Sequence, residues 1–217
     1  MDPIWRYSWP RSNTSIPPIP PTPISARRFC KKIAKDGGHV IVHKPIELRQ
    51  VIAVNGPGST NSLTEGRRAY FSGREIVRWA EYRGIEIMAG RPTHHDHGLD
   101  LPNGMLIAGI EQGADINALA HGMLESHWRD DCDLADAETL ADIGRRAGLD
   151  PQPLLDAALS DDIQAIHVTN TQEAIQRSVF GSPTYFVGGD MFYGQDHLEL
   201  VARAVAKPFA GAWPPVG

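Results

Sequence analysis

Two short apolar stretches joined by a tight turn stand near the end of the chain. They cover residues 179–187 and 191–193, and Asp196 then opens a segment with helical spacing. Proline cannot donate to a sheet ladder, so Pro183 belongs at a strand start, an edge or a bulge, and it often marks a cis bond. The pattern therefore predicts a strand, a turn, a second strand and a closing helix.

Pro183 leaves two interpretations open. If the Ser182–Pro183 bond is cis, the amide and carbonyl of Ser182 turn outward and can pair with an extended peptide by strand addition. Otherwise Pro183 simply opens an ordinary strand. The local sequence does not choose between them.

A helix followed by a strand is predicted earlier in the chain. Residues 26–36 have helical spacing and end at Gly37-Gly38, a typical helix stop. A short apolar segment at residues 39–43 follows as a strand. A helix that leads directly into a strand is typical of the crossover of a parallel sheet.

Only helical patterns occupy the middle of the chain. They cover residues 65–83, 104–129, 136–148 and 154–159, and another helix is expected at 161–177. The predicted fold class is α/β with an all-helical insertion. Residues 26–60 and 161–217 form the α/β domain, and residues 61–160 form the insertion.

Composition and charge narrow the class of protein. The 217 residues are 41% hydrophobic and 22% charged, which suffices for a sizeable core. A net charge of -5 argues against a general nucleic-acid surface, and no apolar run is long enough to span a bilayer. The first residues lack the pattern of a secretory signal, so we expect a cytoplasmic protein.

Cysteine content argues against redox chemistry. The chain has only Cys30 and Cys132, with no Cys-x-x-Cys motif, so a dithiol cycle has no chemical basis. Cys30 lies in a helical pattern and is predicted to be a small core residue. Cys132 is flanked by aspartates, whose charge should raise its pKa and make it a poor nucleophile.

Motifs over most of the chain match one family. They are Lys44-Pro45-Ile46-Glu47-Leu48, Asn55, Arg78-Trp79-Ala80, Asn170-Thr171-Gln172-Glu173-Ala174-Ile175, Val179-Phe180-Gly181-Ser182-Pro183-Thr184-Tyr185 and Gly194-Gln195-Asp196. From about residue 26 to 205, the chain resembles the 2-hydroxychromene-2-carboxylate isomerases. These are glutathione-dependent relatives of the kappa-class glutathione transferases and, more distantly, of the DsbA-like disulfide oxidoreductases. The resemblance implies a thioredoxin-like domain with a helical insertion.

The resemblance also implies a function and a set of ligands. It predicts a homodimeric enzyme of aromatic degradation that uses glutathione to isomerise an aromatic acid, without nucleic-acid or membrane partners. Glutathione would be held by Asn55, by Ser182 and Pro183 through the backbone, and by Gln195 and Asp196. The alternatives are a kappa-type glutathione transferase, which would accumulate a conjugate, and a thioredoxin-like binding module without chemistry.

A cleft between the two domains is the expected substrate site, because small-molecule sites favour domain boundaries. Five large side chains either line this cleft or belong to the core between helices. They are Trp79, Tyr82, Met105, Met123 and Trp128.

The segment His94-His95-Asp96-His97 has the residue types of a metal site. Adjacent side chains diverge, however, so the sequence predicts no metal there. In the family, a polar loop at this place faces the aromatic substrate. The Asn and Arg that are usual in that loop are absent from this segment. His94 is the expected substitute, as a binder of the substrate carboxylate or as a proton shuttle, because the pKa of histidine lies near working pH.

The first 25 residues do not match the family. Relatives begin with a strand and a serine that donates to the glutathione sulfur, and this serine falls near Pro20. The segment with prolines between residues 17 and 23 cannot form a central strand, because each proline lacks the N–H that a sheet ladder needs. Residues 1–25 are therefore predicted to be an aberrant leader, consistent with a reading-frame shift. The chain should then lack the first strand and the serine, with Thr22 and Ser25 as the nearest hydroxyls.

Overall fold

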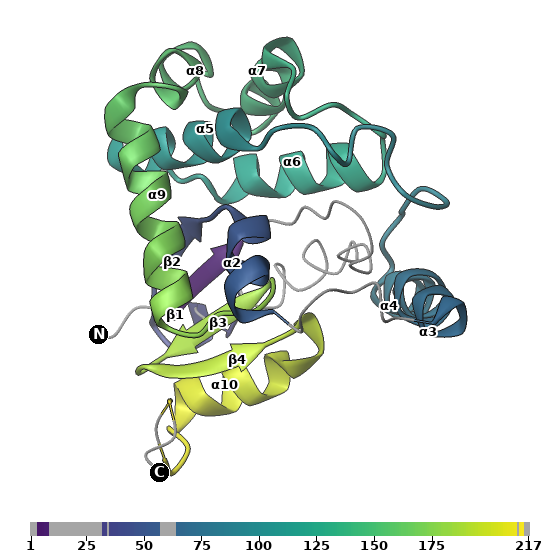
Figure 1. Cartoon of the computed structure of the whole chain (residues 1–217). Coiled ribbons are helices and arrows are strands. Elements are labelled where there is room, and N and C mark those ends of the chain that lie inside the picture. Colours follow the sequence, from purple (N-terminus) through teal and green to yellow (C-terminus); the bar gives the residue numbers. More distant parts are fainter. Residues whose placement is uncertain (1–3, 9–31, 34, 57–63, 212, 215–217) are drawn as a thin grey trace.

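Helices surround a small mixed sheet in the computed structural model of the chain (Figure 1), which describes residues 4–8, 32–33, 35–56, 64–211 and 213–214. The sheet has the order β2-β1-β3-β4, with β1 (Ile4–Ser8), β2 (Ile41–Pro45), β3 (Thr184–Val187) and β4 (Asp190–Tyr193). Strand β1 is parallel to β2 and antiparallel to β3, and β3 is antiparallel to β4.

Helices make up most of the described chain. In chain order they are α2 (Leu48–Asn55), α3 (Glu65–Ala69), the π-helical turn η2 (Tyr70–Arg74), α4 (Glu75–Arg83), α5 (Asp100–Glu111), α6 (Asn117–Trp128), α7 (Ala137–Arg146), α8 (Gln152–Ala158), α9 (Asp161–Gln176), the 3₁₀ turn η3 (Gln195–His197) and α10 (Leu198–Ala206). None of the helices in the described part of the chain is long and apolar enough to cross a membrane.

The sheet contains a first strand, and the prediction that the chain lacks one is wrong. Strand β1 runs over Ile4–Ser8 and pairs with β2 from Ile4 to Ser8. The register of the family places this strand in the segment that holds the prolines between residues 17 and 23, which cannot form it. The strand lies earlier in the chain, in a segment rich in β-branched and aromatic residues, which favour a pleated sheet. The proline segment itself lies outside the described residues.

Two neighbouring residues of β3 pack into separate hydrophobic cores on opposite faces of the sheet. Tyr185 and Phe186 are both fully buried, and successive strand residues point to opposite faces. Phe186 packs in a cluster with residues of α2 and α9, whereas Tyr185 packs with α10 and with Phe192 of β4. The two predicted C-terminal strands and their closing helix are thus confirmed.

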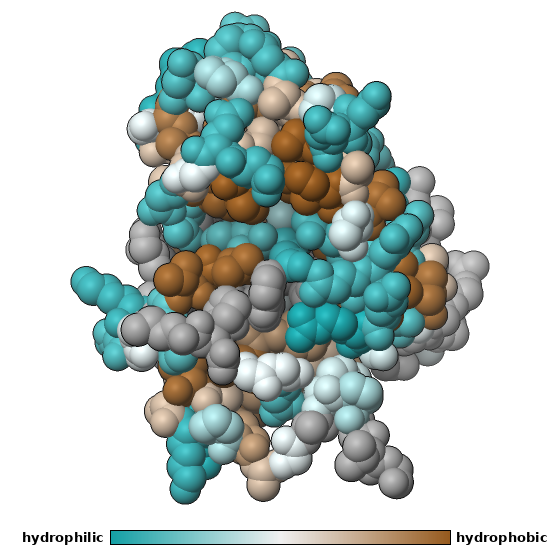
Figure 2. Space-filling view, turned by 90° about the vertical axis from the view of Figure 1, so that its left-hand side faces the viewer, coloured by the Kyte–Doolittle hydropathy of each residue, from teal (hydrophilic) through white to brown (hydrophobic). Residues whose placement is uncertain are grey.

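The helical insertion has its own core above the sheet (Figure 1), built mainly from α5, α6, α7 and α8. Helix α9 extends from this core to the sheet, because Ile163 packs in the insertion and Ala174 packs beside Phe186. Figure 2 shows one face on which a hydrophilic band separates hydrophobic patches of the insertion from those nearer the sheet. Polar contacts between the two parts include Arg49 Nη2 to Asp96 O, at 3.2 Å.

The predicted helix at residues 104–129 is two helices in the structure. Helix α5 ends at Glu111 and α6 begins at Asn117, with Gly113 between them at φ 73°. This left-handed conformation suits glycine and ends the first helix. Apolar spacing continues across the break because both helices face the same core, so periodicity alone does not reveal the turn.

Asn103 of α5 is a buried polar link to the sheet domain. Its Nδ2 donates to Ile46 O at 3.2 Å and lies 3.1 Å from His167 Nε2. Replacing Asn103 by Leu keeps the volume but leaves buried partners unpaired, so we expect a loss of about 1–3 kcal/mol in the free energy of unfolding. Denaturant titration followed by circular dichroism measures this loss.

The control for Asn103 is Gln112→Leu, at the exposed end of the same helix. The Gln112 amide makes only a 3.5 Å contact with Pro153 O. Equal small losses in both variants would contradict the structural role of Asn103.

Candidate functional site

The turn after β4 lies beside the start of β3. Gly194 donates its N–H to Pro183 O at 2.9 Å, which brings the Gln195-Asp196 turn next to Pro183. Gly194 has φ 99°, and a Cβ there would lie 2.4 Å from Asp196 Oδ1. Glycine is therefore favoured at this position by the backbone conformation, and any larger residue would also have to displace the Asp196 side chain.

The bond between Ser182 and Pro183 is cis, as one interpretation of the sequence predicts. Both residues are buried. Thr184 Oγ1 donates to Gly181 O at 2.7 Å and so fixes the chain on either side of the bond. The fold thus brings Ser182, Pro183, Gln195 and Asp196 together.

Gln195 and Asp196 present two different acceptors. Gln195 is only 6% exposed, and its Oε1 is buried without a hydrogen-bond partner among the described residues. The Asp196 side chain is about half exposed. A buried amide oxygen without a donor costs free energy, so its position next to an accessible carboxylate points to a ligand that donates hydrogen bonds there.

Arg83 reaches this turn from the helical insertion. It ends α4, and its guanidinium donates to Gln195 O at 3.0 Å and lies 4.5 Å from the ring centre of Trp79. Burial lowers the pKa of Arg83 from its ordinary value, while the nearby Tyr185 and Asp196 raise it. Because the ordinary pKa of an arginine lies far above neutral pH, the guanidinium stays charged at neutral pH.

Sequence reasoning did not find Arg83. The resemblance includes Arg78-Trp79-Ala80 of the same helix, so it covers the segment but not this residue. The contact joins residues 112 positions apart, and no local pattern indicates it. With Arg83, the site offers a fixed cation beside two acceptors.

The side chain of Asn55 stabilises the backbone between α9 and β3. Asn55 is the last residue of α2, and its Nδ2 donates to Ile175 O at 2.8 Å and to Val179 O at 3.1 Å. Both amide hydrogens are thus used to fix the connection between α9 and β3. Asn55 therefore supports the segment that leads to Pro183, and its side-chain oxygen is the remaining group for the predicted contact with glutathione.

The five candidate cleft residues separate into two groups. Met105, Met123 and Trp128 are almost fully buried in the core of the insertion, so for these three the core interpretation holds. Trp79 lies against Arg83, and Tyr82 is 82% exposed with its ring 5.9 Å from that of Trp79. Of the five, this pair remains available to contact a substrate.

His94 is placed on a turn before α5, partly exposed, with its Nδ1 3.7 Å from Asp133 Oδ2. The positions predicted for the missing family serine, Pro20, Thr22 and Ser25, lie outside the described residues, as does Cys30.

The predicted weak reactivity of Cys132 agrees with its surroundings. Burial raises the pKa of its thiol, and the charge of Asp130 adds to the effect. A thiol with a raised pKa is mostly protonated at neutral pH, and only the thiolate is a strong nucleophile.

Comparison with known proteins agrees with this architecture. The family described as DSBA-like thioredoxin domain matches residues 20–206. A 2-hydroxychromene-2-carboxylate isomerase from Pseudomonas sp. (strain C18) is 29% identical over 184 residues, which cover 83% of this chain and 82% of that protein. This similarity over most of both chains supports the resemblance to these isomerases.

Solved structures share the fold. A selenomethionine 2-hydroxychromene-2-carboxylate isomerase has a TM-score of 0.70 at 22% identity, covering 94% of each chain. The cytosolic disulfide reductase DsbM from Pseudomonas aeruginosa, solved with GSH, has a TM-score of 0.56 at 12% identity, covering 94% of this chain and 93% of that one. The predicted thioredoxin-like domain with a helical insertion is confirmed, and the chain belongs to the DSBA-like thioredoxin domain family.

Proposed function

We propose that the protein is a glutathione-dependent isomerase of aromatic acids similar to 2-hydroxychromene-2-carboxylate. The similarity to a curated isomerase over most of both chains supports the reaction class. The observation that carries the glutathione part is the Gln195-Asp196 turn beside Pro183, where Gln195 Oε1 is buried without a described partner and the guanidinium of Arg83 donates to Gln195 O. The proposal includes a cytoplasmic homodimer that acts in aromatic degradation.

The donors and acceptors of the site match the γ-glutamyl end of glutathione. This end carries an ammonium group and a carboxylate on one carbon. The carboxylate of Asp196 and the amide oxygen of Gln195 would accept from the ammonium group, while Arg83 would pair with the carboxylate. The backbone at Ser182 and Pro183 would bind the middle of the peptide, as the resemblance implies.

The cofactor would supply a thiolate nucleophile, which adds to the unsaturated side chain of the substrate and leaves after bond rotation. The chain's own part is to hold glutathione in one orientation and to bind the aromatic acid nearby. Trp79 and Tyr82 offer an aromatic surface next to Arg83 for that acid. His94 stays a predicted contact for the substrate carboxylate.

Replacing Asp196 by Ala should weaken glutathione binding about tenfold or more. The reason is the loss of a charged hydrogen bond, which contributes roughly 1.5–3 kcal/mol. Isothermal titration of the full chain with reduced glutathione measures the change. The control is Glu199→Ala, which removes an equal charge from an exposed position three residues later. Equal affinities in the two variants would contradict the assignment of Asp196.

Turnover distinguishes the proposed isomerase from its alternatives. Chromatography of 2-hydroxychromene-2-carboxylate incubated with the protein should show the isomer only when glutathione is present, with no loss of glutathione. A stable conjugate would instead indicate a kappa-type glutathione transferase. Binding of glutathione without any product would indicate a binding module.

A further inference from the structure

In the turn that contains His94 and His97, neighbouring side chains point in different directions. His97 N–H donates to His94 O at 3.1 Å, so residues three apart come to the same side. His95 points inward instead, where it is 1% exposed and its Nδ1 lies 2.9 Å from His127 Nε2. Asp96 turns to Arg91, with 2.5 Å between its Oδ1 and the guanidinium.

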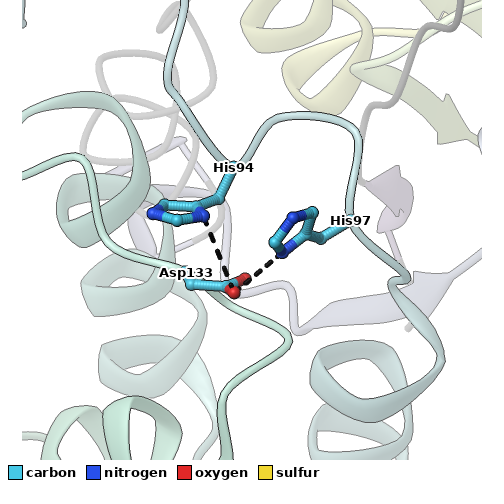
Figure 3. A group of neighbouring side chains, drawn as sticks. All are labelled: His94, His97 and Asp133. Carbon is cyan, nitrogen blue, oxygen red and sulfur yellow. Dashed lines mark hydrogen bonds and ion pairs between the residues drawn. The ribbon is translucent and has the colours of Figure 1, made fainter.

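Asp133 joins the two outward histidines from a second loop, the one that follows α6. Its Oδ2 lies 2.7 Å from His97 Nδ1 and 3.7 Å from His94 Nδ1 (Figure 3). The other oxygen, Oδ1, accepts from Ala135 N–H at 2.9 Å. The carboxylate is therefore held in an orientation that directs Oδ2 toward both imidazoles.

The two loops are fixed to one another by independent contacts. Asp131 accepts from both the N–H and the hydroxyl of Thr93, each at 2.6 Å. Met88 N–H donates to Trp128 O at 2.9 Å. A ligand at the histidines would therefore meet donor groups that are already positioned, which lowers the entropy that binding must overcome.

We propose that His94, His97 and Asp133 form a binding site for Zn²⁺ with three protein ligands and an open fourth position. Two imidazoles and one carboxylate are a typical ligand set for zinc. One donor atom of each residue lies within 4.8 Å of the others. Tetrahedral zinc with bonds of about 2.0–2.1 Å separates its ligands by roughly 3.3 Å, so exposed side chains need to move only slightly.

This proposal departs from the prediction that the histidine segment holds no metal. That prediction rested on the divergence of adjacent side chains, and His94 and His95 do diverge. The site uses instead the spacing of three within the turn, together with an aspartate 36 residues after His97. It is independent of glutathione, because none of its residues belongs to the Gln195-Asp196 turn.

Titration calorimetry of the full chain with Zn²⁺ alone, after dialysis against a chelator, tests the site. The wild-type chain should bind one Zn²⁺ saturably. His97→Ala and Asp133→Asn should each weaken binding by about tenfold or more, because each removes one ligand. Cobalt(II) should give the visible absorption bands of a four-coordinate ion in the wild type and lose them in both variants.

The matched control is His121→Ala. His121 is also a partly exposed histidine, with Glu125 Oε1 3.4 Å away as its carboxylate partner. The proposal predicts wild-type affinity for this variant. The proposal is overturned if the wild-type chain shows no saturable uptake of Zn²⁺, or if His97→Ala and Asp133→Asn bind as tightly as His121→Ala does.

Discussion

Replacing Gly104 by Ala is expected to destabilise the protein by about 3 kcal/mol or more in the free energy of unfolding. A Cβ at this position would lie 2.1 Å from Ala158 O and 2.8 Å from Ala158 C. Both atoms are backbone, so no side chain can rotate away. Helices α5 and α8 would have to separate, which disrupts the packing of the insertion core.

Denaturant titration followed by circular dichroism measures this effect. The control is Gly66→Ala in α3, where an added Cβ meets nothing within 4 Å. Because alanine is a better helix former than glycine, the control should be neutral or stabilising by up to about 1 kcal/mol. Similar stability in the two variants would show that α5 and α8 do not approach as closely as described.

Replacing Arg83 by Met should weaken glutathione binding by about 10-fold to 100-fold. The guanidinium is the cation that contacts the Gln195 carbonyl, and its proposed ligand is the γ-glutamyl carboxylate. A hydrogen-bonded charge pair of this kind contributes roughly 1.5–3 kcal/mol, and each 1.4 kcal/mol corresponds to tenfold in affinity. Titration calorimetry with reduced glutathione measures the loss.

Arg78→Met is the matched control for Arg83. Arg78 is an exposed residue of the same helix, and its guanidinium lies 5.9 Å from the ring centre of Tyr70. Its replacement removes the same charge and should leave the affinity unchanged. If both variants lose affinity equally, the effect comes from net charge, and Arg83 has no specific role.

The C-terminal half of the fold follows from local sequence. Residues 184–187 and 190–193 are strands, and α9 lies within one residue of its predicted range. Short apolar runs bounded by glycine and proline encode these elements directly. The cis bond at Pro183 is one of the two interpretations that the local sequence leaves open. The front of the chain was predicted wrongly because the family register places the first strand in the proline segment, whereas β1 lies before it.

The candidate site was predicted in part. The resemblance indicates Ser182, Pro183, Gln195 and Asp196, and the structure places them together, although their binding of glutathione stays a prediction. Asn55 has a supporting position in the structure, which a single asparagine at a helix end does not disclose. Its amide nitrogen donates to the carbonyls of Ile175 and Val179, because α2 and α9 pack side by side.

The sequence by itself determined the class of the protein: an α/β unit with a helical insertion and no Cys-x-x-Cys motif for redox chemistry. Hydrophobic period and turn residues act over a few positions, so they specify elements and their order. Only the tertiary structure decided which distant side chains meet. Arg83 reaches Gln195, and Asp133 meets His94 and His97, because the tertiary fold brings together segments that lie far apart in the sequence. Contacts of this kind depend on the three-dimensional arrangement of whole elements, which no local pattern records.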